Sequence, residues 1–210
     1  MIPVTNFFMN TAGFGEITGT VYDENNAPFP GVDVTIVGSS VSSTTNENGE
    51  YFINEILAGS QSLTASVFEY EDNTQAIQID AGVVNQLDFT MVPKPRVDVT
   101  GTVVGNDSPT NFIEGALIEM WGYANFQSAT DENGEFIIPW VYGNETYSVK
   151  VSKRGYAPYF NNSVVITDGN IDLGTIVLEE LMSIPYSVYA SDTDASINLD
   201  WNAPNTSMVH

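Results

Sequence analysis

The chain has 210 residues, and its 27 acidic and 5 basic side chains give a formal net charge of −22. Nucleic acids and anionic membranes carry the same sign of charge and are excluded as partners. The chain has no cysteine and a single histidine, His210, so disulfides, zinc–thiolate sites, thiol catalysis and histidine-based triads are excluded as well. Hydrophobic residues make up 42%, which is enough for a folded core. No apolar run approaches the length of about 18 residues that membrane insertion needs.

The first segment, residues 1–15, is predicted to be β-prone. Val4–Met9, with the sequence VTNFFM, is apolar and uncharged, and such a segment aggregates if nothing covers it. The segment lacks the basic region that opens a secretory signal peptide. We therefore expect this segment to pair with a sheet.

Residues 16–93 show the alternation of half-buried strands. Val32, Val34 and Ile36 recur with a period of two, and Ser62–Val67 repeats the pattern. Between these runs lies Thr45–Tyr51, with the sequence TNENGEY. Because both residues of an Asn-Gly pair tolerate positive φ, this stretch predicts a hairpin with a two-residue turn.

Residues 97–180 repeat these landmarks in the same order. Gly19-Thr20-Val21 returns as Gly101-Thr102-Val103, and the Asn48-Gly49-Glu50 turn returns as Asn133-Gly134-Glu135. The alternating run returns as Tyr147–Val151. A repeat of roughly 80 residues is far longer than a solenoid unit, so each copy should have its own core.

The repeated pattern resembles the carboxypeptidase regulatory-like domain. It consists of G-T-V, a polar turn, a glycine before an alternating strand, and then T-D/N-x-N-G-x-F/Y. The resemblance implies an all-β fold of two tandem Greek-key, transthyretin-like β-sandwiches, over residues 16–93 and 97–180, with β-prone segments at both termini. The second copy departs at Asn106–Trp121, where an insertion lengthens its first loop.

The last segment, residues 181–210, resembles the start of a fibronectin type III domain. Two strands are predicted there, Tyr186–Ala190 and Ile197–Trp201. Two strands cannot bury a core of their own. Either the chain is cut from a longer protein or these strands pair with something else, as a strand-donating tail would.

Clustered oxygen ligands in the loops make calcium a candidate cofactor. The predicted ligands are Asp23, Glu24, Asp131 and Glu132. Further loop candidates are Asn25, Asn26, Asn46, Glu47, Asn48, Asp72, Asp168, Asp172, Asp192 and Asp194. The spacing of an EF-hand is absent, and the alternative is a solvated acidic face.

Aromatic residues gather in the second copy, where an exposed platform would stack on a sugar. The candidates are Trp121, Tyr123, Phe126, Trp140, Tyr142, Tyr156, Tyr159 and Phe160. The alternative is core and loop packing, since alternate aromatics on strands normally face inward.

These patterns predict a non-enzymatic structural or adhesive module of an exported, cell-surface or extracellular protein. No pair of residues marks a catalytic site. The partners would be protein, through self-association or neighbouring domains of a larger chain. The first alternative is a self-assembling filament or tube subunit joined by strand donation and bridged by calcium. The second alternative is a carbohydrate-binding module with a glycan partner.

Overall fold

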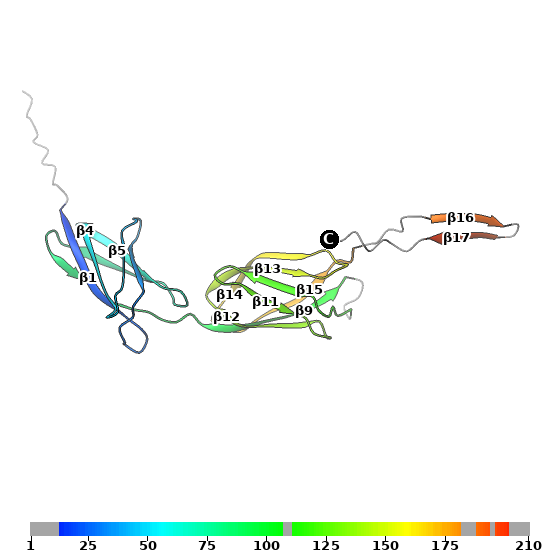
Figure 1. Ribbon diagram of the computed structural model, residues 1–210, viewed down its shortest axis with the longest axis horizontal. Coiled ribbons are helices and arrows are strands. Elements are labelled where there is room, and N and C mark those ends of the chain that lie inside the picture. Colours follow the sequence, from blue (N-terminus) through cyan, green and yellow to red (C-terminus); the bar gives the residue numbers. More distant parts are fainter. Residues whose placement is uncertain (1–12, 107–110, 182–187, 194–195, 202–210) are drawn as a thin grey trace, which may run out of the picture. The chain divides into compact units, whose positions relative to one another are not determined.

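The computed structural model describes residues 13–106, 111–181, 188–193 and 196–201 (Figure 1). This part of the chain is all-β, as predicted, and contains no helix. Accordingly, no helix in it is long and apolar enough to span a bilayer. The chain divides into two compact units, Met1–Lys94 and Pro95–His210. The predicted pairing of Val4–Met9 lies outside the described residues.

The first unit is a sandwich of two sheets. One sheet has the order β4-β1-β7, with β8 also paired to β1; its strands are β1 (Phe14–Tyr22), β4 (Glu50–Leu57), β7 (Val84–Gln86) and β8 (Phe89–Thr90). The other has the order β3-β2-β5-β6; its strands are β2 (Asp33–Ile36), β3 (Ser42–Thr44), β5 (Gly59–Ser66) and β6 (Asn73–Ile79). Strand β1 begins at Phe14, so it includes the last two residues of the segment 1–15 that was predicted to precede the first copy.

The alternating residues of the first unit form its core. Val32 and Val34 are fully buried and Ile36 is 6% exposed, which confirms the period-two prediction. They pack with Ile17 of β1 and Phe89 of β8 in one apolar cluster between the sheets. The strand pattern thus places one face of each sheet inward.

The second unit has the same strand order. One sheet runs β12-β9-β15, with β9 (Arg96–Gly105), β12 (Glu135–Tyr142) and β15 (Ile171–Leu178). The other runs β11-β10-β13-β14, with β10 (Leu117–Trp121), β11 (Phe126–Ala129), β13 (Glu145–Ser152) and β14 (Tyr159–Ile166). Strand β15 takes the place of β7 and β8, pairing in parallel with the first strand of its unit. Val99, Ile118 and Tyr147 are among the residues of its core.

Two further strands follow the sandwich of the second unit. Strands β16 (Val188–Thr193) and β17 (Ser196–Trp201) pair antiparallel with each other. Both overlap the strands predicted from the sequence. The resemblance to a fibronectin type III start stays a prediction.

The prediction of an Asn-Gly hairpin is wrong. Strands β3 and β4 belong to different sheets, and so do β11 and β12, so each turn is a crossover between the two layers of its sandwich. In the pair Asn48-Gly49 only the glycine has a positive φ, of 72°. Local turn preference cannot distinguish a hairpin from a crossover, because the difference lies in which distant strands the flanking residues join.

A buried threonine fixes each crossover to the neighbouring strand. The hydroxyl of Thr45, which is 5% exposed, accepts from the N–H of Val32 at 2.9 Å and donates to the carbonyl of Phe29 at 2.8 Å. Its backbone N–H donates to Val32 as well, at 2.9 Å. These two hydrogen-bond partners of the hydroxyl, Val32 and Phe29, lie 13 and 16 residues earlier in the chain.

The second unit repeats this arrangement at Thr130, which is also 5% exposed. Its hydroxyl accepts from the N–H of Ala116 at 2.8 Å and donates to the carbonyl of Ile113. The repetition shows that the threonine before each turn serves the fold.

Candidate functional site

The predicted calcium ligand Asp131 is a turn residue. Its Oδ1 atom accepts from the backbone N–H groups of Asn133 and Glu135, each at 2.9 Å. Asn46 does the same in the first unit, accepting from Asn48 at 2.9 Å and Glu50 at 3.0 Å. An aspartate or asparagine oxygen that caps backbone donors in this way stabilises a tight turn.

Asp23 has the same role in another loop. Its Oδ1 accepts from the N–H groups of Asn25 at 2.9 Å and Ala27 at 2.8 Å. The other two predicted ligands, Glu24 and Glu132, are exposed. Within the described residues, no group of three or more carboxylates and histidines is arranged to hold a metal ion. The calcium site stays a prediction.

The fold brings Tyr70 close to the carboxylates of the Asp23 loop. Burial, followed by the carboxylates of Glu24, Asp23 and Glu69, raises the pKa of Tyr70 above its ordinary value. The Tyr70 ring lies edge-on to Phe29, with ring centroids 4.8 Å apart. Asp23 and Glu24 therefore contribute to the negative potential around Tyr70, although Tyr70 is more than 40 residues from both in the sequence.

We expect calcium removal to leave the fold unchanged, because backbone donors already satisfy the turn oxygens of Asp23 and Asp131. Thermal unfolding of the full chain in about 5 mM calcium and in excess chelator should give midpoints that agree within about 1 °C, since binding to the native state alone would raise the midpoint by mass action. A midpoint several degrees higher in calcium would establish an ion site. In that case Glu24→Gln and Glu132→Gln variants would show which loop holds it.

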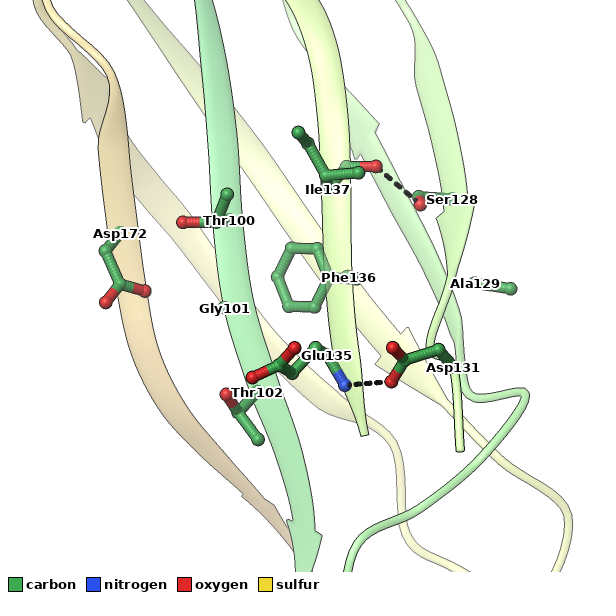
Figure 2. A pocket seen from close by; sticks show the side chains of 10 residues that line it. All are labelled: Thr100, Gly101, Thr102, Ser128, Ala129, Asp131, Glu135, Phe136, Ile137 and Asp172. Atoms are coloured by element: carbon green, nitrogen blue, oxygen red, sulfur yellow. Dashed lines mark hydrogen bonds between the residues drawn. The ribbon is translucent and has the colours of Figure 1, made fainter. Parts of the chain in front are cut away.

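A groove lies beside the crossover of each unit. In the second unit it has a volume of about 520 Å³ and is lined by Thr100, Gly101, Thr102, Ser128, Ala129, Asp131, Glu135, Phe136, Ile137 and Asp172 (Figure 2). In the first unit it has a volume of about 580 Å³ and is lined by Thr18, Gly19, Thr20, Ser43, Asn46, Glu50, Tyr51, Phe52 and Gln86. The lining comes from equivalent strands, so one surface feature occurs twice.

The two grooves differ in charge. The first has a single carboxylate, Glu50, whereas the second has three, Asp131, Glu135 and Asp172. No histidine, cysteine or lysine is among the residues that line either groove. The hydroxyls and carboxylates can exchange hydrogen bonds with a polar segment, and the second groove attracts cationic groups.

A ring packs on a glycine beneath each groove. Gly19 of β1 is the cross-strand neighbour of Tyr51, and Gly101 of β9 is the neighbour of Phe136. A Cβ atom on either glycine would lie 2.8 Å from the ring of its partner. The Tyr51 hydroxyl also donates to the carbonyl of Leu87 at 2.6 Å.

The partly buried phenol of Tyr51 leads us to expect that the first unit loses stability at alkaline pH. Burial, with a smaller contribution from Asp88, raises the pKa of Tyr51 above its ordinary value of about 10. The folded state holds the phenol proton more tightly than the unfolded state does. The resulting contribution to stability is fully present below a pH of about 10, and it is lost as the pH rises from about 10 towards the folded-state pKa.

Tyr51→Phe should reduce this alkaline loss, at a cost of about 0.5–1.5 kcal/mol at neutral pH for the missing hydrogen bond. Urea unfolding at pH 8 and pH 11 measures both effects. Phe136 occupies the equivalent position in the second unit and shows that the fold accepts a phenyl ring there. Equal losses of stability in the native chain and the variant between these pH values would show that Tyr51 does not carry the effect.

The aromatic residues of the second unit do not form one platform. Tyr142 is 5% exposed, and four others pack partly buried against the core, namely Tyr123, Phe126, Tyr156 and Tyr159. Trp121, Trp140 and Phe160 are exposed to 39%, 69% and 55%. The core-packing interpretation thus holds for most of the set, and a glycan-binding surface stays a prediction.

Trp140 has a left-handed backbone conformation, with a φ of 62°, at a bulge between β12 and β9. Its N–H donates to a carboxylate oxygen of Asp98 at 3.4 Å, and its carbonyl accepts from Arg96 at 3.2 Å. Glu55 has a φ of 54° at the equivalent place in the first unit. The bulge is therefore part of the shared architecture, and its residue type differs between the units.

Residues 16–92 match the family of the carboxypeptidase regulatory-like domain. The match covers the sandwich of the first unit, where the resemblance had been inferred from the sequence. No curated protein matches the sequence.

Two solved structures share the fold over most of the chain. A streptococcal ancillary pilin is 13% identical, with 82% of this chain and 63% of the pilin covered at a TM-score of 0.51. The minor pilin of Streptococcus agalactiae is 12% identical, with 82% of this chain and 99% of the pilin covered, also at 0.51. The chain spans 34% of the length of another match, the Bacillus anthracis TIE protein, which is 14% identical over 80% of this chain at a TM-score of 0.36. At these identities the likeness concerns the fold.

Proposed function

We propose that the chain is a non-enzymatic, load-bearing structural module of an extracellular or cell-surface protein. The observation that carries this proposal is the pairing of the terminal strands in each unit. Strand β1 pairs in parallel with β7 and β8, from Glu16↔Val84 to Tyr22↔Thr90. Strand β9 pairs in parallel with β15, from Ile171↔Val99 to Leu178↔Gly105.

Parallel pairing of the first and last strands determines how a pulling force acts. The chain enters a unit at the start of its first strand and leaves at the end of its last strand. When two strands are parallel, these points lie at opposite ends of the pair. A force between them therefore acts along the strands and loads several backbone hydrogen bonds together. Such a unit resists extension better than one whose bonds open in sequence.

The likeness to the two pilins supports this role, since both proteins are pilins by their names and share the fold over 82% of this chain. We further propose that the second unit is a second copy of the regulatory-like domain. The matching strand order, the threonine pair Thr45 and Thr130, and the paired grooves support this assignment. The acidic surface suits a solvated exterior.

A second candidate role is self-assembly by strand donation. The observation that favours it is an open sheet edge in the first unit, formed by β6, which pairs with β5 alone among the described strands. An exposed edge of this kind offers unpaired backbone groups to another chain.

Antibody labelling of intact cells that produce the protein tests the proposed location. We expect intact cells to be labelled as strongly as permeabilised cells, and brief protease treatment of intact cells to remove the label. Labelling that appears only after permeabilisation would contradict an extracellular role. An antibody against a cytoplasmic protein serves as the control for cell integrity.

A further inference from the structure

The outer face of one sheet differs between the two units, although the strands that form it are equivalent. In the first unit a row of cross-strand neighbours runs over β3, β2, β5 and β6 and consists of Ser42, Thr35, Thr64 and Thr74. In the second unit the equivalent row runs over β11, β10, β13 and β14 and consists of Gln127, Glu119, Lys150 and Phe160. Four short hydroxyl side chains in one copy are thus replaced by an amide, an acid, a base and an aromatic ring in the other.

A tryptophan at the end of β10 continues this difference. Trp121 is the cross-strand neighbour of Ser148 on β13 and is 39% exposed. Its counterpart in the first unit is Val37, whose backbone N–H donates to the carbonyl of Ser62 on β5 at 2.9 Å. Because the first unit folds with valine and hydroxyl residues at these positions, the fold does not require the larger side chains. Their presence in one copy points to a binding role that is specific to the second unit.

A groove beside Trp121 brings an aromatic ring and polar side chains together. Its volume is about 430 Å³, and its lining consists of Glu119, Met120, Trp121, Asn125, Phe126 and Gln127. This volume lies within the range of about 300–1,000 Å³ that is typical of small-ligand sites. Asn125 and Gln127 are exposed, and each amide offers both hydrogen-bond donors and an acceptor. The groove therefore combines an apolar surface with polar groups around it.

The charges at this groove are balanced. Glu119 is the charged residue of its lining, and the Oε2 atom of Glu119 lies 2.7 Å from the Nζ atom of Lys150. The side chains of Glu119 and Lys150 are 30% and 34% exposed, so both remain accessible to a ligand. An anionic ligand would be repelled by a chain with a net charge of −22, and a cationic ligand would find this carboxylate already paired. An uncharged ligand suits the site best.

We propose that this face of the second unit binds a neutral oligosaccharide, with one sugar ring in the groove against Trp121. A sugar ring presents apolar C–H groups on its faces and hydroxyl groups around its rim. The indole of Trp121 covers one apolar face, while Asn125, Gln127 and Glu119 exchange hydrogen bonds with the hydroxyls. The proposal adds a binding activity to the structural role and does not depend on it.

The position of Phe160 extends the site beyond one sugar. Phe160 is 55% exposed on β14, which lies two strands away from β10 in the same sheet. Neighbouring strands are about 4.8 Å apart, so Trp121 and Phe160 are separated by about 10 Å across the strands. Lys150 lies on the strand between them. A chain of several sugars that crosses the sheet would contact both rings, whereas a short one at Trp121 would contact only the indole.

Binding of the full chain to immobilised sugars tests the proposal. The probes are neutral hexasaccharides of glucose, xylose, mannose and N-acetylglucosamine, with sialylated and sulfated sugars for comparison. We expect binding to a neutral hexasaccharide and not to the acidic sugars, and calorimetric titration then measures the affinity of that hexasaccharide and of its disaccharide.

Two variants carry residues of the first unit, so both are expected to fold. Trp121→Val should weaken the binding of both sugars about tenfold, because the stacking surface is lost. Phe160→Thr should weaken only the binding of the hexasaccharide. Trp140→Ala is the matched control, because Trp140 is 69% exposed on β12 of the other sheet, and it should leave both affinities unchanged.

Several results would overturn the proposal. No binding to any neutral hexasaccharide, or binding to the acidic sugars alone, would exclude the proposed ligand. Neutral-sugar binding that Trp121→Val leaves unchanged, or that Trp140→Ala abolishes, would place the site elsewhere. An unchanged hexasaccharide affinity in Phe160→Thr would contradict the extension across the sheet. If no sugar bound and light scattering showed a dimer that Trp121→Val dissociates, the face would instead belong to a contact with a second copy of this chain.

Discussion

Replacing Thr130 with valine is expected to lower the free energy of unfolding of the second unit by about 2–4 kcal/mol. Valine fills the same volume but leaves the N–H of Ala116 and the carbonyl of Ile113 without the hydroxyl. Each buried polar group that loses its partner costs about 1–3 kcal/mol. Thr45→Val should have a similar effect on the first unit, through Val32 and Phe29.

The two units can be followed separately in urea titrations of the full chain. All three tryptophans, at positions 121, 140 and 201, follow the first unit in sequence, so tryptophan fluorescence monitors the second unit and far-UV circular dichroism monitors both. Thr146→Val is the control, because Thr146 is exposed on β13 of the second unit, and a change within about 0.5 kcal/mol is expected there. If Thr130→Val changed the fluorescence transition as little as this control, the buried hydroxyl would not fix the crossover.

Gly19→Ala is expected to destabilise the first unit by about 3 kcal/mol or more, which is at the upper end for overpacking. A Cβ atom at Gly19 would lie only 1.8 Å from the Leu87 carbonyl oxygen and 2.8 Å from the Tyr51 ring. The carbonyl belongs to the backbone and cannot move without shifting the chain beside β8. Tyr51 would also lose its hydrogen-bond geometry with Leu87.

Gly101→Ala should cost less, about 1–2 kcal/mol, because its nearest neighbours are the ring atoms of Phe136 at 2.8 Å, and the closest backbone atom, the Gly174 oxygen, is 3.2 Å away. A ring can shift by a few tenths of an ångström. Urea titrations of both variants give the comparison. Equal losses, or a larger loss for Gly101→Ala, would contradict the close approach of Leu87 to Gly19.

The strands were predictable because their signal is local. Val32, Val34 and Ile36 alternate in the sequence and are buried in the structure. The crossover at Asn48-Gly49 was predicted as a hairpin because the turn residues are the same in both cases, and the difference depends on pairing with β1 and β2. Such pairing joins residues that are far apart in the sequence.

The candidate site was less accessible from the sequence. Asp23 and Asp131 were correctly placed in loops, but their oxygens cap backbone N–H groups, a role that depends on turn geometry. The approach of Tyr70 to Asp23 and Glu24 requires the folded sandwich. The repeated threonine at positions 45 and 130 was visible as a signal, yet its function depends on Phe29 and Ile113, which only the fold brings near.

The uncharged edge at β6 shows what the combination of sequence and fold adds. The sequence NTQAIQI is ordinary until the topology places it at the edge of a sheet. The same holds for VTNFFM, whose lack of charge has a consequence only if an edge is available.

Single-molecule extension of the full chain between its two ends tests the load-bearing claim most directly. The account predicts two separate unfolding events. Each should release roughly 80 residues, or about 260–290 Å of chain at about 3.3–3.6 Å per residue, less the length of the folded unit. Both events should need high force, because the β1–β7, β1–β8 and β9–β15 pairs are loaded along their strands. Extension at low force without two distinct events would contradict the proposal that these sandwiches bear load.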